Sequence, residues 1–329
     1  FSIWIRGNFF IPDAKRFWKR QAVNKINSYL LDNKIDAIAS TGPPHTTHLI
    51  AQKVAKKHNI PWLADFRDPW TNIDFYHQLK LTYWADKKHK RLEKKVLQDT
   101  NKIVTVSKSW AKDFKQISGI DPIVINNGFD PSDFEDAGVL KLDKKFSITH
   151  VGSLNKDRNP FVFWNVLADI IQENDNFSSD LQIKLIGPID VTVNEELERN
   201  QLLSQTTLIE SLPHKEVLNH LMKSQTLLLP LNDVPNIDGV IPGKMYEYFG
   251  AKRPIICIGK IDGNAAEIIK ETNTGIVVGF SNAEKLKQEI LRMYHDYKNG
   301  NLQVHSQNYT KYSRKILASK IANVLDTIT

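Results

Sequence analysis

Short apolar segments alternate with longer segments of helical periodicity along nearly the whole chain. Apolar runs rich in β-branched and aliphatic residues are typical of buried parallel strands, and the intervening segments are typical of the helices that connect them. This alternation predicts an α/β protein with parallel sheets. The expected strands lie at 37–39, 61–66, 102–106, 146–151, 182–186, 206–208, 226–230 and 255–258, and the segment 122–126 ends the first run of elements. The expected helices include 13–32, 45–58, 80–98 and one starting at 161.

The alternation is interrupted once, by a polar segment at 130–145 that carries a Pro and a Gly and is the best candidate for a linker. With 329 residues, of which 41% are hydrophobic and 25% charged, the chain has the size of two ordinary domains. We expect a first domain at 1–137, a second at 138–308, and a C-terminal segment at 309–329 with a helix at 313–325. Two such doubly wound units in series predict a cleft between them, with ligands at the carboxyl ends of the strands.

The run at 239–257 carries the strongest functional signal. A loop with two glycines and a proline opens a helix whose first turn contains Lys244, and Glu247 follows three residues later. The free N–H groups of a helix start, the positive end of the helix dipole and the lysine charge all favour a phosphate. A carboxylate one turn further suits the hydroxyls of a ribose, so the pair indicates a nucleotide. Alternatively, the loop only shapes a helix start and the two side chains form a solvated pair.

The sequence Lys-Met-Tyr-Glu-Tyr at 244–248, followed by small residues, a proline and an apolar strand, resembles the donor-site helix of the retaining glycosyltransferases of family 4, or glycosyl transferases group 1. The segment 150–160 is similar to the glycine turn with which this family grips the donor diphosphate. Segments 61–70 and 125–130 resemble parts of its first domain and interdomain edge. The resemblance implies the GT-B fold, which has two Rossmann-like domains facing a cleft. The donor-binding positions that it implies are Gly152, Ser153, Arg158, His214, Asp238, Gly239, Val240, Ile241, Gly243, Lys244 and Glu247.

Two positions depart from the pattern of that family. Family members often have a Glu, seven arbitrary residues and a second Glu; with Glu247 as the second, the first falls on Gly239, and the neighbouring Asp238 is the candidate substitute. Many members also place a His after the strand expected at 61–66, where this chain has Arg67 and Asp68.

We assign Asp65, Arg67 and Asp68 to the acceptor side of the cleft. An arginine could neutralise phosphate charge, and Asp68 could bind a sugar hydroxyl or orient the guanidinium. The alternative is a buried structural ion pair with Asp68 capping the next turn.

A further candidate for the acceptor side is the helix start after Thr41-Gly42-Pro43-Pro44. His45 and His48 are three residues apart on this helix and face the loop at Gly42, so both could reach the cleft. Capping or surface histidines are an equally good interpretation of these two residues.

The positive charge is concentrated in the first part of the chain. Residues 1–130 hold 22 Lys and Arg against 12 Asp and Glu, whereas residues 131–329 hold 22 against 25. The densest part is the predicted helix at 86–95, which is either a solvated face or a site of attraction to an anionic membrane surface. Nucleic acid is a less favoured partner because no helix-turn-helix, zinc-finger spacing or RNP-like strand is present.

Cys257 is the only cysteine and falls in an expected buried strand, so no disulfide framework exists and a reducing compartment is expected. The longest apolar runs are too short to span a bilayer, and the chain does not open on a signal peptide. We therefore expect a cytoplasmic protein that could lie peripherally on the inner face of the membrane. The chain starts at Phe1, without the N-terminal portion that members of the similar family carry, so we expect that portion to be missing.

These observations predict a metal-independent, cofactor-free glycosyltransferase. Arg158 and Lys244 would stabilise the leaving diphosphate, and neither an Asp-x-Asp motif between strands nor a zinc-type His/Cys cluster is evident. The resemblance implies a retaining transfer from a UDP- or GDP-sugar to a glycan or lipid-linked glycan in bacterial surface polysaccharide synthesis. A nucleotide-sugar 2-epimerase of the same fold and a nonenzymatic nucleotide-sugar-binding protein remain open as alternatives.

Overall fold

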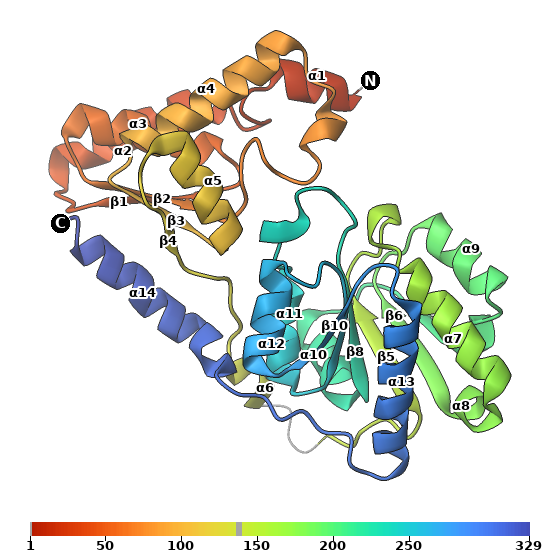
Figure 1. The fold of residues 1–329 in the computed structure, drawn as a ribbon. Coiled ribbons are helices and arrows are strands. Elements are labelled where there is room, and N and C mark those ends of the chain that lie inside the picture. The colour runs from red at the N-terminus through yellow and green to blue at the C-terminus, as the bar shows by residue number, and fades with distance from the viewer. Residues whose placement is uncertain (1, 136–139) are drawn as a thin grey trace. The chain divides into compact units, whose positions relative to one another are not determined.

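The strands of the computed structural model, which describes residues 2–135 and 140–329, pair in parallel and alternate with helices in sequence (Figure 1). The chain divides into two compact units, one made of 1–127 and 315–329 and the other of 128–314. The boundary expected between residues 137 and 138 lies outside the described residues. The observed division falls ten residues earlier, after Asn127, and the second division falls after Arg314.

The first unit contains a four-stranded parallel sheet in the order β1 (Ile38–Gly42), β2 (Trp62–Phe66), β3 (Lys102–Thr105) and β4 (Ile123–Val124). Its helices are α1 (Ser2–Phe9), α2 (Trp18–Asp32), α3 (Thr46–His58), α4 (Tyr83–Asp99) and α5 (Lys108–Ser118), with a short 3-10 helix η1 (Tyr76–Leu79). Every residue of β2 is buried, as expected for a strand between two others and covered on both faces.

The last helix, α14 (Arg314–Asp326), belongs to the first unit. Its residues Leu317 and Val324 are buried together with Leu63, Val104 and Ile125 from β2, β3 and the segment after β4. Seven residues separate the two helical positions, so both lie on the same face of the helix. The chain therefore leaves the first unit at 128 and returns to it at 315.

The second unit contains a six-stranded parallel sheet in the order β10-β9-β8-β5-β6-β7. Its strands are β5 (Phe146–Val151), β6 (Leu181–Ile186), β7 (Thr206–Ile209), β8 (Thr226–Pro230), β9 (Ile255–Ile258) and β10 (Gly275–Val278). The first strand, β5, has β6 on one side and β8 on the other. The strand order therefore reverses between β5 and β8, which is where doubly wound sheets bind ligands.

Helices cover both faces of this second sheet. Leu228 and Ile256 point to the core beneath the helices α7 (Phe161–Glu173), α8 (Asp175–Asp180), α9 (Val191–Arg199) and α13 (Ala283–Lys298). The adjacent residues Leu227 and Ile255 point to a second core beneath α10 (His214–Lys223), α11 (Gly243–Ala251) and α12 (Asn264–Thr272). Because successive side chains of a strand point to opposite faces, strands buried on both sides are continuously apolar.

Several expected elements have different ends in the structure. The helix expected from residue 13 begins at Trp18, because Asp13 instead accepts hydrogen bonds from the backbone N–H of Thr46 at 2.9 Å and from its hydroxyl at 2.8 Å. The helix expected from residue 80 begins at Tyr83, where the Thr82 side chain accepts from the Ala85 N–H. Helix α1 was not expected from the sequence. Among the described residues, no helix combines the length and apolar character needed to cross a bilayer.

The packing of α14 can be tested with two adjacent aliphatic residues. Leu317 is buried and Ile316 is 41% exposed. Leu317→Ala should lower the free energy of unfolding by about 2–4 kcal/mol because it leaves a cavity against the sheet. Ile316→Ala should lower it by less than about 1 kcal/mol. Urea denaturation of both variants measures the difference, and equal losses would contradict the packing described.

Candidate functional site

The turn after β5 lies at the point where the strand order reverses. Gly152 has φ 97°, a conformation that side chains rarely adopt, and its N–H donates to the Ile186 carbonyl at 2.8 Å. Gly187, which follows β6, has φ 113°, and a Cβ atom there would be 3.2 Å from the Gly152 carbonyl. The two turns are therefore packed backbone to backbone, and both positions require glycine.

The Lys244 ammonium lies against this glycine turn. Its Nζ donates to the Val151 carbonyl at 2.5 Å and is 3.4 Å from His150 Nε2. A Cβ atom at Gly152 would be only 2.9 Å from the same Nζ. Lys244 is the second residue of α11, so the helix start and the turn after β5 meet at one cation.

The two titratable groups at this point have strongly shifted pKa values. Burial, followed by the nearby Arg158 guanidinium, lowers the pKa of Lys244 to about 7, with Glu247 opposing both effects. Burial, followed by the lysine charge, lowers the pKa of His150 to about 3. His150 is therefore neutral; its Nδ1–H donates to the Leu228 carbonyl at 3.1 Å, which leaves Nε2 to accept from Lys244.

Arg158 contacts the same turn from another side. Its Nε donates to Asn232 Oδ1 at 2.9 Å and its Nη1 lies 3.4 Å from the Ser153 carbonyl. Two cations thus contact carbonyls on either side of Gly152. The structure brings together four of the expected donor-site residues: Gly152, Ser153, Arg158 and Lys244.

The start of α11 is open. A Cβ atom added at Gly243 would meet no atom of the described residues within 4 Å. The preceding residue, Pro242, provides no side-chain cap for the N–H groups of the first turn. Before it, Gly239 ends the 3-10 helix η4 (Ile237–Gly239), Ile241 is buried and Val240 is half-buried.

The two carboxylates expected near the donor, Glu247 and Asp238, have different partners. Glu247, one turn into α11, lies 3.2 Å from Nε2 of His214, the first residue of α10. Asp238 instead forms an ion pair with Lys260 and is half-exposed. Glu247 and His214 are therefore adjacent, whereas Asp238 is already engaged by a cation.

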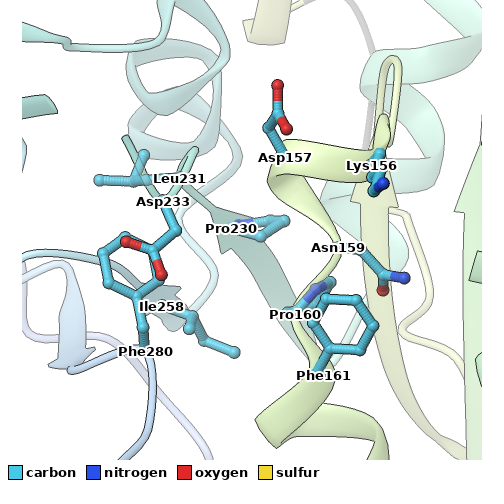
Figure 2. A pocket seen from close by; sticks show the side chains of 10 residues that line it. All are labelled: Lys156, Asp157, Asn159, Pro160, Phe161, Pro230, Leu231, Asp233, Ile258 and Phe280. Carbon is cyan, nitrogen blue, oxygen red and sulfur yellow. The ribbon is translucent and has the colours of Figure 1, made fainter. Parts of the chain in front are cut away.

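A small cavity of about 140 Å³ opens beside this site, at the carboxyl ends of β8 and β9 (Figure 2). The side chains of Pro230, Ile258 and Pro160 give the cavity an apolar lining, and Asp157 and Asp233 also line it (Figure 2). The Asp233 N–H donates to the Asp157 carbonyl at 3.0 Å, which joins the two loops. Because ligand pockets generally enclose about 300–1,000 Å³, this cavity is too small to hold a nucleotide.

In the first unit, Arg67 links the carboxyl ends of three strands. Its N–H donates to the Gly42 carbonyl at 3.0 Å, its Nε pairs with Asp65 Oδ2 at 2.8 Å, and its Nη1 donates to Asn127 Oδ1 at 2.9 Å. The Arg67 side chain is 33% exposed, so the pair is only partly buried and the guanidinium remains accessible. Burial, followed by Asp74, raises the pKa of Asp68.

A buried carboxylate from α4 holds the turn after Arg67 and Asp68. Glu93 accepts from the Trp70 N–H at 3.1 Å and the Thr71 N–H at 3.2 Å, and its other oxygen accepts from the Thr71 hydroxyl. Trp70 Nε1 donates to Nδ1 of His89, one turn earlier in α4, at 3.0 Å. The carboxylate bonded to this turn is therefore Glu93.

Both histidines near Gly42 are buried, so their interpretation as surface or capping residues was wrong. The His45 ring stacks on Trp70 with centroids 4.9 Å apart and makes no side-chain cap, and the His48 ring stacks on Phe66 at 4.3 Å. Burial lowers the pKa of His45 to about 4 and that of His48 well below its ordinary value. Both rings are therefore neutral and lie against the Gly42 backbone.

Sequence reasoning missed His150, Asn232 and Glu93. His150 and Asn232 lie at or just after the ends of β5 and β8, and a polar residue at the end of an apolar strand was the available signal. Glu93 lies within a run of basic residues, and only its contacts distinguish it from its solvated neighbours. Within the described ranges, no group of three His, Cys, Asp or Glu side chains is placed to hold a metal ion.

Two family models match the chain in succession. The model described as Glycosyltransferase Family 4 matches residues 3–133, and the model described as Glycosyl transferases group 1 matches residues 145–296. Together they cover most of the chain. No curated protein matches it by sequence.

Solved structures share the fold at low sequence identity. A sucrose-phosphate synthase from Thermosynechococcus elongatus is 12% identical with a TM-score of 0.68, covering 95% of this chain and 79% of its own. HepE from Anabaena in complex with UDP is 12% identical with a TM-score of 0.69, and the match covers 93% of this chain and 82% of the HepE chain. A trehalose-phosphate synthase (UDP-forming) from Burkholderia vietnamiensis is 10% identical with a TM-score of 0.67, covering 94% and 79%. These likenesses show the GT-B fold, with two Rossmann-like domains.

The shifted pKa of Lys244 makes anion binding at the glycine turn depend on pH. A lysine with a pKa of about 7 loses its charge above that pH, and an anion binds the charged form more tightly. Sulfate keeps a constant charge in this range, so its affinity should fall by up to about tenfold per pH unit above about pH 7. Titration calorimetry or competition measures this slope. The slope should vanish in Lys244→Met, and a flat profile for the unmodified protein would contradict the assignment.

Proposed function

The chain belongs to the glycosyltransferases of family 4, group 1, and we propose that it transfers a sugar from a UDP- or GDP-sugar to a glycan or lipid-linked glycan. The observation that supports this most is the pair of cations at the Gly152 turn. Lys244 and Arg158 contact carbonyls on either side of this glycine, next to an open helix start. Such a site suits the diphosphate of the donor.

Cleavage of the donor places negative charge on the leaving diphosphate. Fixed cations and backbone N–H groups aimed at that charge lower the barrier without reorganisation. Lys244 and Arg158 are the cations of this step, and the N–H groups near Gly152 and Gly243 are its backbone donors. We propose that these groups suffice and that the transfer requires neither a metal ion nor a cofactor.

The neighbours of the phosphate site supply the remaining donor contacts. Glu247 lies one turn from Lys244 and would accept from the ribose hydroxyls, while His214 beside it lies where the base would sit. The segment Gly239 to Ile241 and Asp238 would contact the sugar. Structures of the same fold in complex with UDP and with UDP-glucose support a uridine nucleotide as the first probe.

On the acceptor side, we assign Arg67, with Asp65, Asp68, Gly42 and His45 around it, to contacts with the acceptor. The half-exposed guanidinium suits a phosphate or a hydroxyl-rich acceptor, such as a lipid-linked glycan. Asp65 orients the guanidinium, and Gly42 and the buried His45 ring shape the loop beside it. We propose retention of configuration, a cytoplasmic location and a role in bacterial surface polysaccharide synthesis on the resemblance to family 4.

Nucleotide binding is tested by the thermal shift that UDP and GDP produce. Lys244→Ala should lose most of the shift because it removes the cation at the glycine turn. Lys145→Ala is the matched control, since Lys145 is exposed and lies just before the opposite end of the same strand, β5. The control should keep the full shift. An unchanged shift in Lys244→Ala would overturn the phosphate assignment.

The reaction class is tested by product analysis with UDP-sugars. Transfer predicts that UDP release depends on a glycan or lipid-linked acceptor and that the acceptor gains a sugar. Formation of an epimeric nucleotide-sugar without an acceptor would instead identify a 2-epimerase. Binding with neither product would identify a nonenzymatic nucleotide-sugar-binding protein.

A further inference from the structure

Of the aromatic side chains exposed among the described residues of the first unit, six lie on α1 and at the starts of α2 and α4. They are between 36% and 76% exposed, although Trp, Phe and Tyr normally bury most of their surface. We call them the aromatic face, and they are Trp4, Phe9, Phe17, Trp18, Tyr83 and Trp84.

Helix packing and hydrogen bonds connect the segments that carry the aromatic face. Helix α1 packs on η1 and α4, and the Thr82 N–H, just before α4, donates to Asn8 Oδ1 at 2.7 Å. The start of α2 is joined to α1 by Arg16, whose guanidinium donates to the Phe9 carbonyl and lies 5.1 Å from the Phe17 ring centroid. The three segments therefore form one local assembly within the first unit.

The side of α1 that carries Gly7 is packed against the rest of the first unit. A Cβ atom at Gly7 would be 2.8 Å from Leu81 Cδ2, and the Gly7 carbonyl accepts from His89 Nε2 at 3.2 Å. Phe9 lies two residues from Gly7, on a different side of the helix, and is 60% exposed; its ring pairs with that of Trp4, with centroids 5.8 Å apart.

A stripe of basic residues continues from the aromatic face along α4. Trp84, Lys87, Lys88, Arg91 and Lys95 lie at helical spacing on one face and are all exposed. The acidic residues among them do not oppose this charge. Asp86 pairs with Lys90 at 2.8 Å and accepts from Tyr76, and Glu93 is buried against the Trp70 turn. We call these four basic residues the basic stripe.

The first unit as a whole also carries a positive net charge. Residues 1–127 and 315–329 hold 24 Lys and Arg against 12 Asp and Glu, whereas residues 128–314 hold 20 against 25. A surface that combines exposed Trp and Tyr with Lys and Arg suits the boundary of an anionic bilayer. There the aromatic rings enter the headgroup region and the cations meet lipid phosphates.

We propose that the aromatic face and the basic stripe bind the surface of an anionic phospholipid bilayer. The proposal names a membrane-contact surface for the lipid-linked acceptor proposed above, and in that respect it rests on the proposed function. Its physical basis lies in the first unit alone. It is therefore independent of nucleotide binding, which depends on the Gly152 turn in the second unit.

The test is co-sedimentation of the full chain with phosphatidylcholine vesicles, with or without phosphatidylglycerol. The unmodified protein should bind the anionic vesicles and not the neutral ones, and added salt should weaken binding. Lys87→Gln/Lys88→Gln/Arg91→Gln should lower the partition coefficient by about fivefold per charge, hence on the order of a hundredfold. The control variant Lys56→Gln/Lys57→Gln/Lys112→Gln removes as many charges from exposed positions of the same unit. Its partition coefficient should fall much less.

The aromatic contribution is tested separately. Trp18→Ser/Trp84→Ser should weaken binding by about tenfold or more, because two rings no longer enter the interface. Tyr29→Ser/Leu31→Ser, which removes two exposed apolar side chains near the end of α2, should bind as the unmodified protein does.

Three results would overturn the proposal: equal binding to neutral vesicles, equal losses in each variant and its control, or tighter binding to duplex DNA than to the anionic vesicles at the same salt. The UDP thermal shift of every variant shows that the chain is folded. A normal shift without vesicle binding would reject this inference and leave the proposed function standing.

Discussion

The buried ammonium of Lys244 is the group on which the proposed donor site depends. Removing an ammonium from water is costly, and among the described residues it has a carbonyl and a neutral imidazole, but no carboxylate, in direct contact. That arrangement explains the neighbouring residues: a side chain at Gly152 would collide with the cation, and a charged His150 would repel it. Arg158 adds a second positive charge nearby. An incoming diphosphate would meet groups already fixed in place, which is the condition for strong electrostatic stabilisation.

The parallel sheet of the second unit creates this arrangement. β5 and β8 are adjacent in the sheet, and the strands that follow them, β6 and β9, lie on opposite sides of this pair. The carboxyl ends of β5 and β8 therefore lie together where the strand order reverses. The turn after β5 brings Gly152, the loop after β8 brings Asn232 to orient Arg158, and the start of α11 brings Lys244. Three segments separated by up to about ninety residues thus meet through topology alone.

Helix α4 has two roles in the first unit, and residues on different faces of the helix carry them. The buried positions His89 and Glu93 hold the Trp70 turn, and thereby the loop that carries Arg67 and Asp68. The exposed positions Lys88 and Arg91 belong to the basic stripe. Substituting exposed residues should therefore alter surface binding without disturbing the acceptor-side loop, whereas the buried carboxylate cannot be removed without leaving backbone N–H groups unpaired.

The sequence by itself determined the α/β class, most strands and the family resemblance, and it predicted a phosphate site at the segments around Gly152 and Lys244. These follow from local patterns: apolar runs, glycine turns and a cation at a helix start. Only the tertiary structure decided that His150 lies beneath Lys244, that Asp238 is engaged by Lys260, that the two histidines near Gly42 are buried, and that Glu93 is buried within a basic helix. A sequence motif specifies which groups are available, but their contacts, burial and protonation arise from segments that are distant in the chain and meet only in the folded protein.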